Sequence, residues 1–336
     1  MNRYRVSALL LIAAWLLAGP ALTGSGSAVW ATGSAESGTS EPVATGSGEL
    51  EPLVFGLMPA VDSIPLIVAE AEGFFEEEGV PVRLEVFRDQ LRREAARQAG
   101  TIDGTVSDLV NAIRSWANDA DYRVIASTQG YFSFVTSSAS GITSLEQWPQ
   151  APDTVRTGLL EDSIINFTAG RMLQAVGLDP GRVEIIPTTQ IPVRMELVAS
   201  GDLEAAVLPE PVTRMAVAAG AGELVNTSVL DWTPGVLLVT GEALAEKPAE
   251  LEALLRAYDR AIEAVNADPD AYRAIVVERA SLPPPTAGSM RIPTYEPAAV
   301  PRRDQVAAVA EWMLERGLVS ELPPHDEIVA ERPFAE

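Results

Sequence analysis

Short apolar runs alternate with longer amphipathic stretches along the chain from about residue 52. The runs predict strands and the stretches predict helices, because one face recurs every two residues in a strand and every 3.6 residues in a helix. The expected strands are 53–57, 82–87, 102–106, 122–128, 131–138, 154–159, 183–188, 204–209 and 235–242. The expected helices are 64–73, 91–99, 107–117, 163–176, 192–200, one that ends at 219, 251–265 and 304–318.

The order of these elements predicts an α/β fold. A strand–helix alternation occurs once in each half of the chain, and each alternation implies a mainly parallel sheet flanked by helices. The strands at 122–128 and 131–138 are expected to pair and to lead into a crossing between the halves. The strand at 235–242 is expected to return to the first half, which the C-terminal helices then cover.

The N-terminal segment differs from the rest of the chain. Two arginines precede an apolar run at 6–18, which a Gly-Pro pair ends. This run is shorter than the ~20 residues that a membrane-spanning helix needs, and 29–31 offers a cleavage site. Residues 1–31 are therefore predicted to be a secretory signal peptide, with an uncleaved anchor as the alternative. The Gly/Ser-rich stretch at 32–50 is predicted to be a flexible linker.

Composition narrows the possible functions. The formal charge of −23 opposes binding to nucleic acid, and we expect none. The absence of cysteine excludes disulfides and a lipoprotein anchor, so a periplasmic location is expected. His325 is the single histidine and lies in a polar stretch that is expected to be exposed. The chain therefore lacks the residues for a Ser-His-Asp triad or a histidine-rich metal site. We expect no catalytic residue, metal site or cofactor.

Three segments carry a resemblance to a known family. They are PLIVAEAEGFFEEEGVPV (65–82), TIDGTVSDLVNAI (101–113) and IPVRMELVASGDLEAAVLPEPVTRMA (191–216). In this order they resemble the nitrate/sulfonate/taurine/thiamine-pyrimidine group of solute-binding proteins of ABC importers. The resemblance covers about residues 52–280.

The resemblance implies a two-lobed type II periplasmic-binding-protein fold. The first lobe would be discontinuous and consist of 51–140 and 236–336, and the second lobe would be 141–235. Two crossings, near 138–142 and 231–235, would form the hinge. The implied function is capture of a small organic solute by hinge closure, in a monomer that delivers it to ABC permease subunits in the membrane.

Two other functions are compatible with such a fold. An exported sensory module would use the same closure to signal to a receptor. Enzymes of pyrimidine-precursor or menaquinone biosynthesis resemble the same scaffold. The former use a histidine and a cysteine-rich motif that this chain lacks, and the latter work in the cytoplasm.

Ligands of open parallel sheets bind at the carboxyl ends of the strands, where helix N-termini also converge. This rule selects as ligand-binding candidates Asp62, Ser63, Ser107, Asp108, Thr128, Gln129, Glu161, Asp162, Ser163, Gln190, Arg194 and Glu210. Serine and aspartate at helix starts are also common N-caps, and this alone accounts for Asp62, Ser107 and Ser163.

The candidates contain five acids and one well-placed base, Arg194. A carboxylate pairs well with an amine, so the charges favour a neutral or amine-bearing solute such as an aminopyrimidine over a small anion. A sulfonate-like solute stays open, because acids at helix N-termini can also serve to complement the helix dipole. Tyr131, Phe132, Phe167 and Trp232 are candidates for stacking on a ring, with core packing as the alternative.

Overall fold

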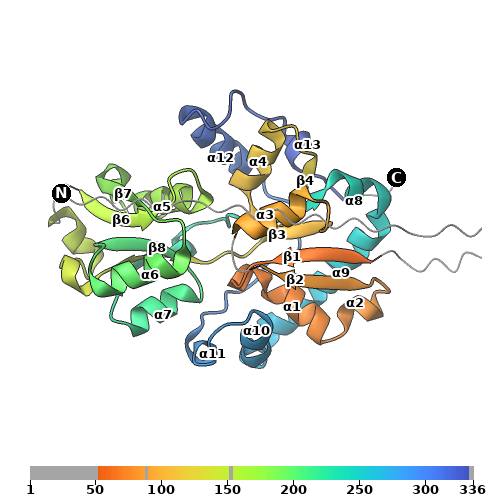
Figure 1. The fold of residues 1–336 in the computed structure, drawn as a ribbon, viewed down its shortest axis with the longest axis horizontal. Coiled ribbons are helices and arrows are strands. Elements are labelled where there is room, and N and C mark those ends of the chain that lie inside the picture. Colours follow the sequence, from red (N-terminus) through yellow and green to blue (C-terminus); the bar gives the residue numbers. More distant parts are fainter. Residues whose placement is uncertain (1–51, 88–89, 151–153, 333–336) are drawn as a thin grey trace, which may run out of the picture. The chain divides into compact units, whose positions relative to one another are not determined.

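The computed structural model describes residues 52–87, 90–150 and 154–332. The predicted signal peptide (1–31) and linker (32–50) lie outside the described residues. The chain forms two five-stranded sheets with helices on both faces of each (Figure 1). In the described part, no helix has both the length and the apolar character to cross a membrane.

The first sheet is mainly parallel. Its strands, in spatial order, are β2 (Val82–Val86), β1 (Leu53–Leu57), β3 (Gly104–Asp108), β10 (Gly235–Thr240) and β4 (Tyr122–Thr128). The strand β10 runs antiparallel to both of its neighbours. The helices connecting the strands are α1 (Ile64–Ala71), α2 (Phe74–Glu77), α3 (Gln90–Gln98) and α4 (Leu109–Ala117).

The second sheet repeats this plan. Its strands are β7 (Val183–Pro187), β6 (Val155–Leu159), β8 (Ala205–Pro209), β5 (Phe132–Thr136) and β9 (Gly222–Asn226), and here β5 is the antiparallel strand. Its helices are α5 (Ile164–Ala175), α6 (Ile191–Ser200) and α7 (Val212–Ala218). The expected α/β architecture of two helix-flanked sheets is therefore confirmed.

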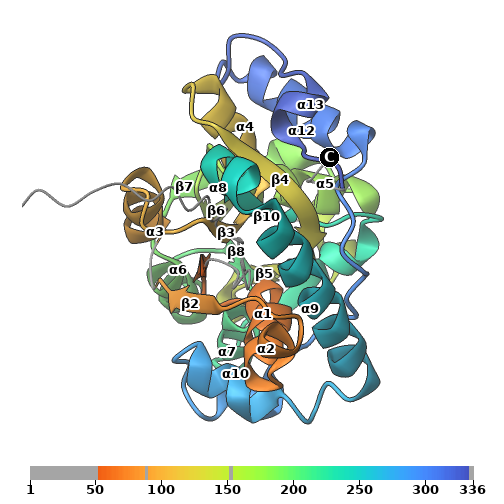
Figure 2. The ribbon, with the colours of Figure 1, turned by 90° about the vertical axis from the view of Figure 1, so that its right-hand side faces the viewer.

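Burial explains why the apolar runs become central strands. All five residues of β8 and the first five of β10 are buried, as is typical of strands that helices cover on both faces. The helix α9 (Pro248–Ala267) packs with α1 and α2 on one face of the first sheet (Figure 2). On the other face, α4 packs with α12 (Arg303–Glu315).

The expected pairing of 122–128 with 131–138 is wrong. The strand β5 pairs with β8 and β9 in the second sheet, whereas β4 pairs with β10 in the first. The chain therefore crosses between sheets at 129–131, and not near 138–142. It crosses back at 227–234, which includes most of the expected second crossing. Two apolar strands joined by three residues have the pattern of a hairpin, and that pattern does not reveal that the chain continues into another sheet.

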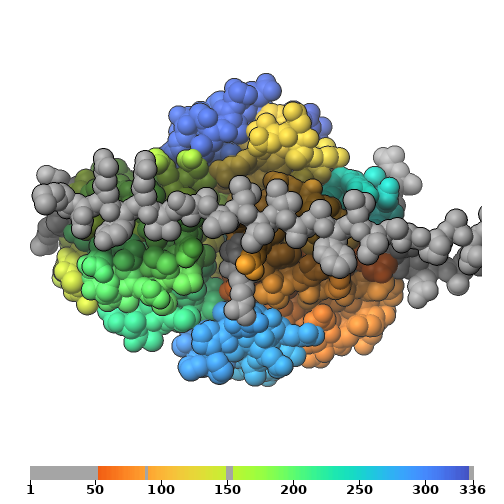
Figure 3. All heavy atoms as spheres, viewed as in Figure 1, coloured from red at the N-terminus to blue at the C-terminus, as the bar shows by residue number. Residues whose placement is uncertain are grey.

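The C-terminal third contacts both sheets. It continues from α8 (Gly241–Glu246) and α9 through α10 (Arg273–Arg279), α11 (Thr286–Ser289), α12 and α13 (His325–Ile328). The helix α10 contacts α1 of the first sheet, and α11 contacts α7 of the second. Figure 3 shows this light-blue region against both the orange and the green surfaces.

Candidate ligand-binding site

The carboxyl ends of the parallel strands carry most of the predicted residues. In the first sheet, Asp62 follows β1, while Asp108 and Thr128 end β3 and β4. In the second sheet, Glu161 and Glu210 follow β6 and β8. Buried polar atoms at these ends have no hydrogen-bond partner among the described residues, namely Asp62 Oδ1, Ser107 Oγ, Thr128 Oγ1 and Glu210 Oε2. Such atoms are rare in folded proteins, so they mark this region as the candidate site.

Asp62 lies in a 3-10 turn, Val61–Ser63, between β1 and α1. Its side chain is half-buried, but Oδ1 is enclosed and unpartnered. Burial raises the pKa of Asp62 to about 6, although the nearby Arg93 guanidinium lowers it, and the Asp108 carboxylate adds to the rise. Next to it, Ser63 is buried and donates to the carbonyl of Met58 at 2.8 Å, which is a structural contact.

Asp108 is the N-cap of α4. Its Oδ1 accepts from the backbone N–H of Asn111 at 2.9 Å, and Oδ2 accepts from the Asn111 side chain at 2.6 Å. Burial raises the pKa of Asp108, while Asn111 and Arg93 oppose that rise. The expectation that capping accounts for Ser107 is wrong, because Ser107 still belongs to β3 and its hydroxyl caps nothing.

Strand register brings Asp108 and Thr128 to the same end of the first sheet. Gly235 of β10 pairs with Asp108 on one side and with Thr128 on the other. A Cβ on Gly235 would lie 2.5 Å from Thr128 Oγ1, closer than atoms in contact allow. Glycine at this position therefore leaves room for the Thr128 hydroxyl against β10.

Arg93 lies near two acids of the candidate site, and sequence reasoning did not select it. It lies on α3 and is almost fully buried. Its Nη1 donates to the carbonyl of Val106 at 2.8 Å, and its Nε has no partner among the described residues. Its positive charge acts on both Asp62 and Asp108. The highly charged composition of 90–98 gives no signal that one of its arginines turns inward.

Glu210 is the most enclosed acid of the site. It follows β8, is fully buried, and precedes Pro211 through a cis peptide bond. Burial raises the pKa of Glu210 to about 7, although Arg214 and Arg291 act in the opposite direction. Its Oε1 accepts from Arg214 Nε at 3.0 Å, while Oε2 is unpartnered.

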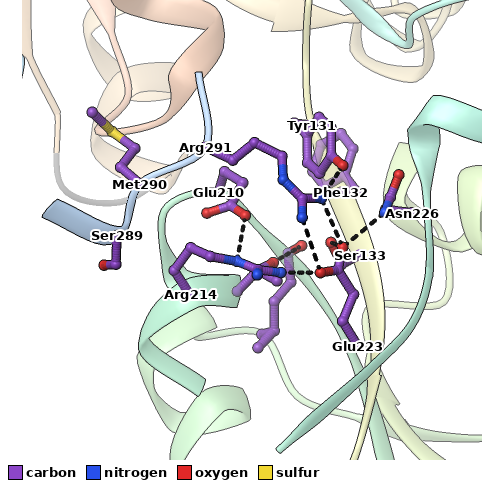
Figure 4. A network of polar contacts seen from close by, with 12 residues as sticks. Tyr131, Phe132, Ser133, Glu210, Arg214, Glu223, Asn226, Ser289, Met290 and Arg291 are labelled. Atoms are coloured by element: carbon purple, nitrogen blue, oxygen red, sulfur yellow. Dashed lines mark hydrogen bonds and ion pairs between the residues drawn. The ribbon is translucent and has the colours of Figure 1, made fainter. Parts of the chain in front are cut away.

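A polar network extends from Glu210 (Figure 4). Arg214 also pairs with Glu223 of β9, and Glu223 Oε1 accepts from Arg291 Nη1 at 3.1 Å. Ser133 Oγ and Asn226 Nδ2 donate to the same Glu223 oxygen at 3.0 and 2.8 Å. Sequence reasoning missed this network, because its members come from four separate segments and none carries a motif.

The remaining candidates of the second sheet are more exposed. Glu161, Asp162 and Gln190 are exposed, and Gln190 makes no capping bond to α6. Ser163 caps α5 as expected, since its Oγ accepts from the backbone N–H of Asn166 at 3.4 Å. The carbonyl of Asp162 accepts from Arg114 Nη2 of α4 at 2.7 Å, which links the helices of the two sheets.

Arg194 does not serve as the expected base at the site. Its guanidinium is 1% exposed and donates to backbone carbonyls, to Thr188 through Nε and Nη2 at 3.2 and 2.7 Å, and to Val207 through Nη1 at 2.9 Å. Burial lowers the pKa of Arg194 to about 10. It therefore links the residue after β7 to the middle of β8. The positive charges near the site acids come from Arg93, Arg214 and Arg291 instead.

Two further predicted residue groups lie elsewhere. Gln129 lines a different hollow, of about 490 Å³, beside both crossings. Among the aromatic candidates, Phe167 packs against Trp232 and Trp312, with ring centroids 5.5 and 5.6 Å apart. His325 is half-buried with an enclosed Nδ1, so its expected exposure is wrong. Within the described ranges no group of three or more His, Cys, Asp or Glu residues could hold a metal ion.

The chain is similar to several solved structures. The periplasmic aliphatic sulphonate binding protein SsuA from Escherichia coli has a TM-score of 0.68 at 17% identity, over 83% of this chain and 92% of that one. A ligand-binding component of an ABC-type import system from Staphylococcus aureus, with zinc bound, reaches 0.70 at 15% identity, over 85% and 98%. The desulfurization enzyme DSZB reaches 0.57 at 16% identity, over 84% and 97%.

These likenesses show a shared fold, which is the fold that the resemblance implied. No curated protein sequence matches the chain. Residues 46–281, which make up most of the chain, match the NMT1-like family. The chain therefore belongs to the NMT1-like family and has the two-sheet fold of periplasmic binding proteins.

Proposed function

We propose that this protein is the extracytoplasmic solute-binding component of an ABC importer. The two sheets with their helices act as two lobes, joined at 129–131 and 227–234. A small organic solute binds at the strand ends of one lobe, and the other lobe closes over it. ABC permease subunits then receive the solute from the closed form. The predicted signal peptide and the fold shared with periplasmic import proteins support this location and role.

One observation carries the proposal. Buried, unpartnered oxygens lie at the carboxyl ends of strands in both sheets, on Asp62, Thr128 and Glu210. A buried acceptor without a partner costs about 1–3 kcal/mol, so the fold is less stable than it would be with a partner present. A solute with several hydrogen-bond donors would satisfy these oxygens. Oxygens of this kind at the strand ends of both sheets are what a site for a hydrogen-bonding solute requires.

The charges support a solute that carries an amine or several N–H groups. Asp62 and Glu210 each have an unpartnered oxygen, and in its carboxylate form each can accept a hydrogen bond from such a group. An aminopyrimidine resembling a thiamine precursor has the required donors on a flat ring. Arg93, Arg214 and Arg291 already form hydrogen bonds or ion pairs with protein groups, so they are less able to bind an anionic solute. A sulfonate is therefore the second choice.

A thermal-shift panel tests the proposal. The purified protein is heated with aminopyrimidines, thiamine precursors, flavins, alkanesulfonates, nitrate and amino acids. A specific solute at about 100 times its dissociation constant adds about 2.7 kcal/mol to the free energy of unfolding, which is a clear rise in Tm. If nitrate or an alkanesulfonate proves to be the tight ligand, the argument from charge is wrong.

A matched pair of variants then locates the site. Asp62→Asn removes a charged acceptor. It should lower the affinity for an amine-bearing solute by about 10- to 100-fold, as expected for a charge-assisted hydrogen bond. Asp326→Asn, an exposed position on α13, should leave the affinity unchanged. Isothermal titration calorimetry measures both. Equal affinities for the two variants would place the solute elsewhere.

A second candidate is an enzyme on the same scaffold, since the desulfurization enzyme DSZB shares the fold. The single histidine lies at the start of α13, near Arg303 and Glu331, and not among the site acids. An enzyme would consume the solute found in the panel, whereas a binding protein returns it unchanged. Mass spectrometry of the solute after prolonged incubation distinguishes the two.

A further inference from the structure

Arg291 reaches from the first lobe to the second. It lies between α11, which also contacts α7 of the second lobe, and α12, and two residues beside it, Met290 and Tyr295, contact the first lobe. Met290 is 2% exposed in the core that covers β1, and its carbonyl accepts from Arg273 of α10. Tyr295 donates through its hydroxyl to the carbonyl of Val61 at 2.6 Å. Its backbone N–H also donates to Asn266 of α9 at 2.9 Å. The backbone of Arg291 therefore moves with the first lobe.

The acceptor of Arg291 is fixed to the second lobe. Glu223 lies on β9 and also accepts hydrogen bonds from Ser133 of β5, from Asn226 and from Arg214 of α7. Burial alone would raise the pKa of Glu223, but the hydrogen bonds from Arg214 and Asn226 lower it below its usual value. The carboxylate is therefore ionised at neutral pH, and three contacts from its own lobe hold it in place.

The guanidinium of Arg291 makes three contacts across the junction. It pairs with Glu223 at 3.1 Å, donates to the hydroxyl of Tyr131, and lies 5.1 Å from the centroid of the Tyr131 ring. Tyr131 belongs to the first crossing between the sheets. Figure 4 shows Arg291 pointing from its own loop toward Glu223, beside Glu210 and Arg214. Because Arg214 bonds to both Glu223 and Glu210, these contacts lie next to the candidate ligand site.

We propose that Arg291 and Glu223 form a latch between the two lobes, which stabilises the arrangement seen in this structure relative to a more open one. Residues on each side of the latch are anchored to different lobes, so opening the lobes must break it. Neither residue needs to touch the solute. Both are positioning residues that set how often the lobes are closed. The inference rests on the proposed hinge closure.

The expected strength of the latch is modest. Arg291 is 39% exposed, so water screens the ion pair. A pair of this kind shifts a two-state equilibrium by about 1.5- to 5-fold. An effect of this size leaves the lobes free to open, which a solute-binding protein requires.

The test measures the distance between lobes in the ligand-free protein. The chain has no cysteine, so Glu76→Cys on α2 and Glu196→Cys on α6 give one exposed labelling position on each lobe. Spin labels at both positions report the distance distribution by double electron–electron resonance. Arg291→Gln and Glu223→Gln should each raise the long-distance population about 1.5- to 5-fold. The double variant should go no further than the stronger single variant, because both remove the same contact.

Glu78→Gln is the matched control. Glu78 also accepts from two arginines, Arg256 and Arg260, but this cluster lies wholly within the first lobe. The Glu78→Gln substitution should therefore leave the distances between the lobes unchanged. Arg291→Lys, which keeps the charge, should stay closer to the native distribution than Arg291→Gln. A circular dichroism melt of each variant excludes misfolding as the cause of any change.

The latch is refuted if Arg291→Gln and Glu223→Gln keep the native distribution, or if Glu78→Gln changes it equally. No solute enters this measurement, so its outcome is independent of the thermal-shift panel. If no compound in the panel binds, the proposed function is contradicted, but the result for the latch still holds. If a compound binds and the variants keep the native distances, only the latch is contradicted.

Discussion

Glu210 shows how the protein interior changes the chemistry of one residue. Its carboxyl group is fully buried, and Arg214 and Arg291 do not fully offset the cost of enclosing a charge. The protonated form is therefore favoured in the folded protein more than in the unfolded chain. The carboxylate form, which would pair with an amine, gains population as the pH rises through about 7.

This predicts a stability that depends on pH. The pKa of Glu210 rises from 4.5 to about 7 on folding, so the folded state binds more protons than the unfolded state between these values. The free energy of unfolding should therefore fall as the pH rises from 5 to 8, by on the order of 1–3 kcal/mol from this group. Glu210→Gln should remove that part of the loss, whereas the exposed Glu196→Gln should retain it. Urea unfolding at pH 5 and pH 8 measures this fall in the free energy of unfolding. Equal losses in the native protein and Glu210→Gln would contradict the assignment.

Single residues also mark the limit of sequence reasoning. The local pattern predicts that Asp62, Asp108, Thr128 and Glu210 lie at or just after the ends of apolar strands, and the structure places them there. Arg93 and Arg291 were missed because their importance comes from partners far away in the chain. Arg194 was misjudged for a related reason. It does follow a strand, as predicted, but its guanidinium donates to the carbonyls of Thr188 and Val207.

At the scale of elements, the strand β10 connects the two polar strand ends of the first sheet. The apolar run predicted this strand, but not that it lies between β3 and β4. Pairing depends on contacts across more than 100 residues, which local periodicity does not encode. The same limit explains why the sequence pattern predicts that β4 and β5 pair, although they belong to different sheets. Ser107 was misplaced by one residue, since β3 extends to Asp108 before α4 begins.

The close approach at Gly235 leads to a prediction for this element. Gly235→Ala places a Cβ 2.5 Å from Thr128 Oγ1 and 3.2 Å from the Thr128 carbonyl oxygen. Because β10 lies between two strands, the overlap should lower the free energy of unfolding by about 1–3 kcal/mol. Adding Thr128→Ala removes the hydroxyl and should recover part of this loss.

Gly170→Ala is the matched control. It lies in α5, where an added Cβ would meet Pro180 at an ordinary 4.0 Å, so the substitution should be neutral or stabilise the protein by up to about 1 kcal/mol. Guanidinium unfolding compares the variants. If Gly235→Ala were as stable as Gly170→Ala, the strand ends would be less tightly packed than the structure shows.

At the scale of the whole molecule, the two sheets share one plan and are joined by two short crossings. The resemblance of three sequence segments was sufficient to predict this fold, because their order follows the topology. It was not sufficient to place the first crossing or to show that the C-terminal third contacts both sheets. Thr233 ties the crossings together. Its hydroxyl donates to the carbonyl of Thr128 and accepts from the backbone N–H of Gly130 at 3.0 Å.

These two hydrogen bonds of Thr233 predict which segments become more mobile when the hydroxyl is removed. Thr233→Val keeps the size of the side chain but leaves the Gly130 N–H without that partner, which should cost about 1–2 kcal/mol. Hydrogen exchange followed by mass spectrometry should show faster exchange at 129–131 and 227–234, with α9 unchanged. Thr101→Val is the control, since it removes a similar hydroxyl-to-carbonyl bond at the end of α3, away from the crossings. Faster exchange throughout both lobes in Thr233→Val would show that the threonine supports global stability. Faster exchange confined to the crossings would identify them as the flexible part on which closure depends.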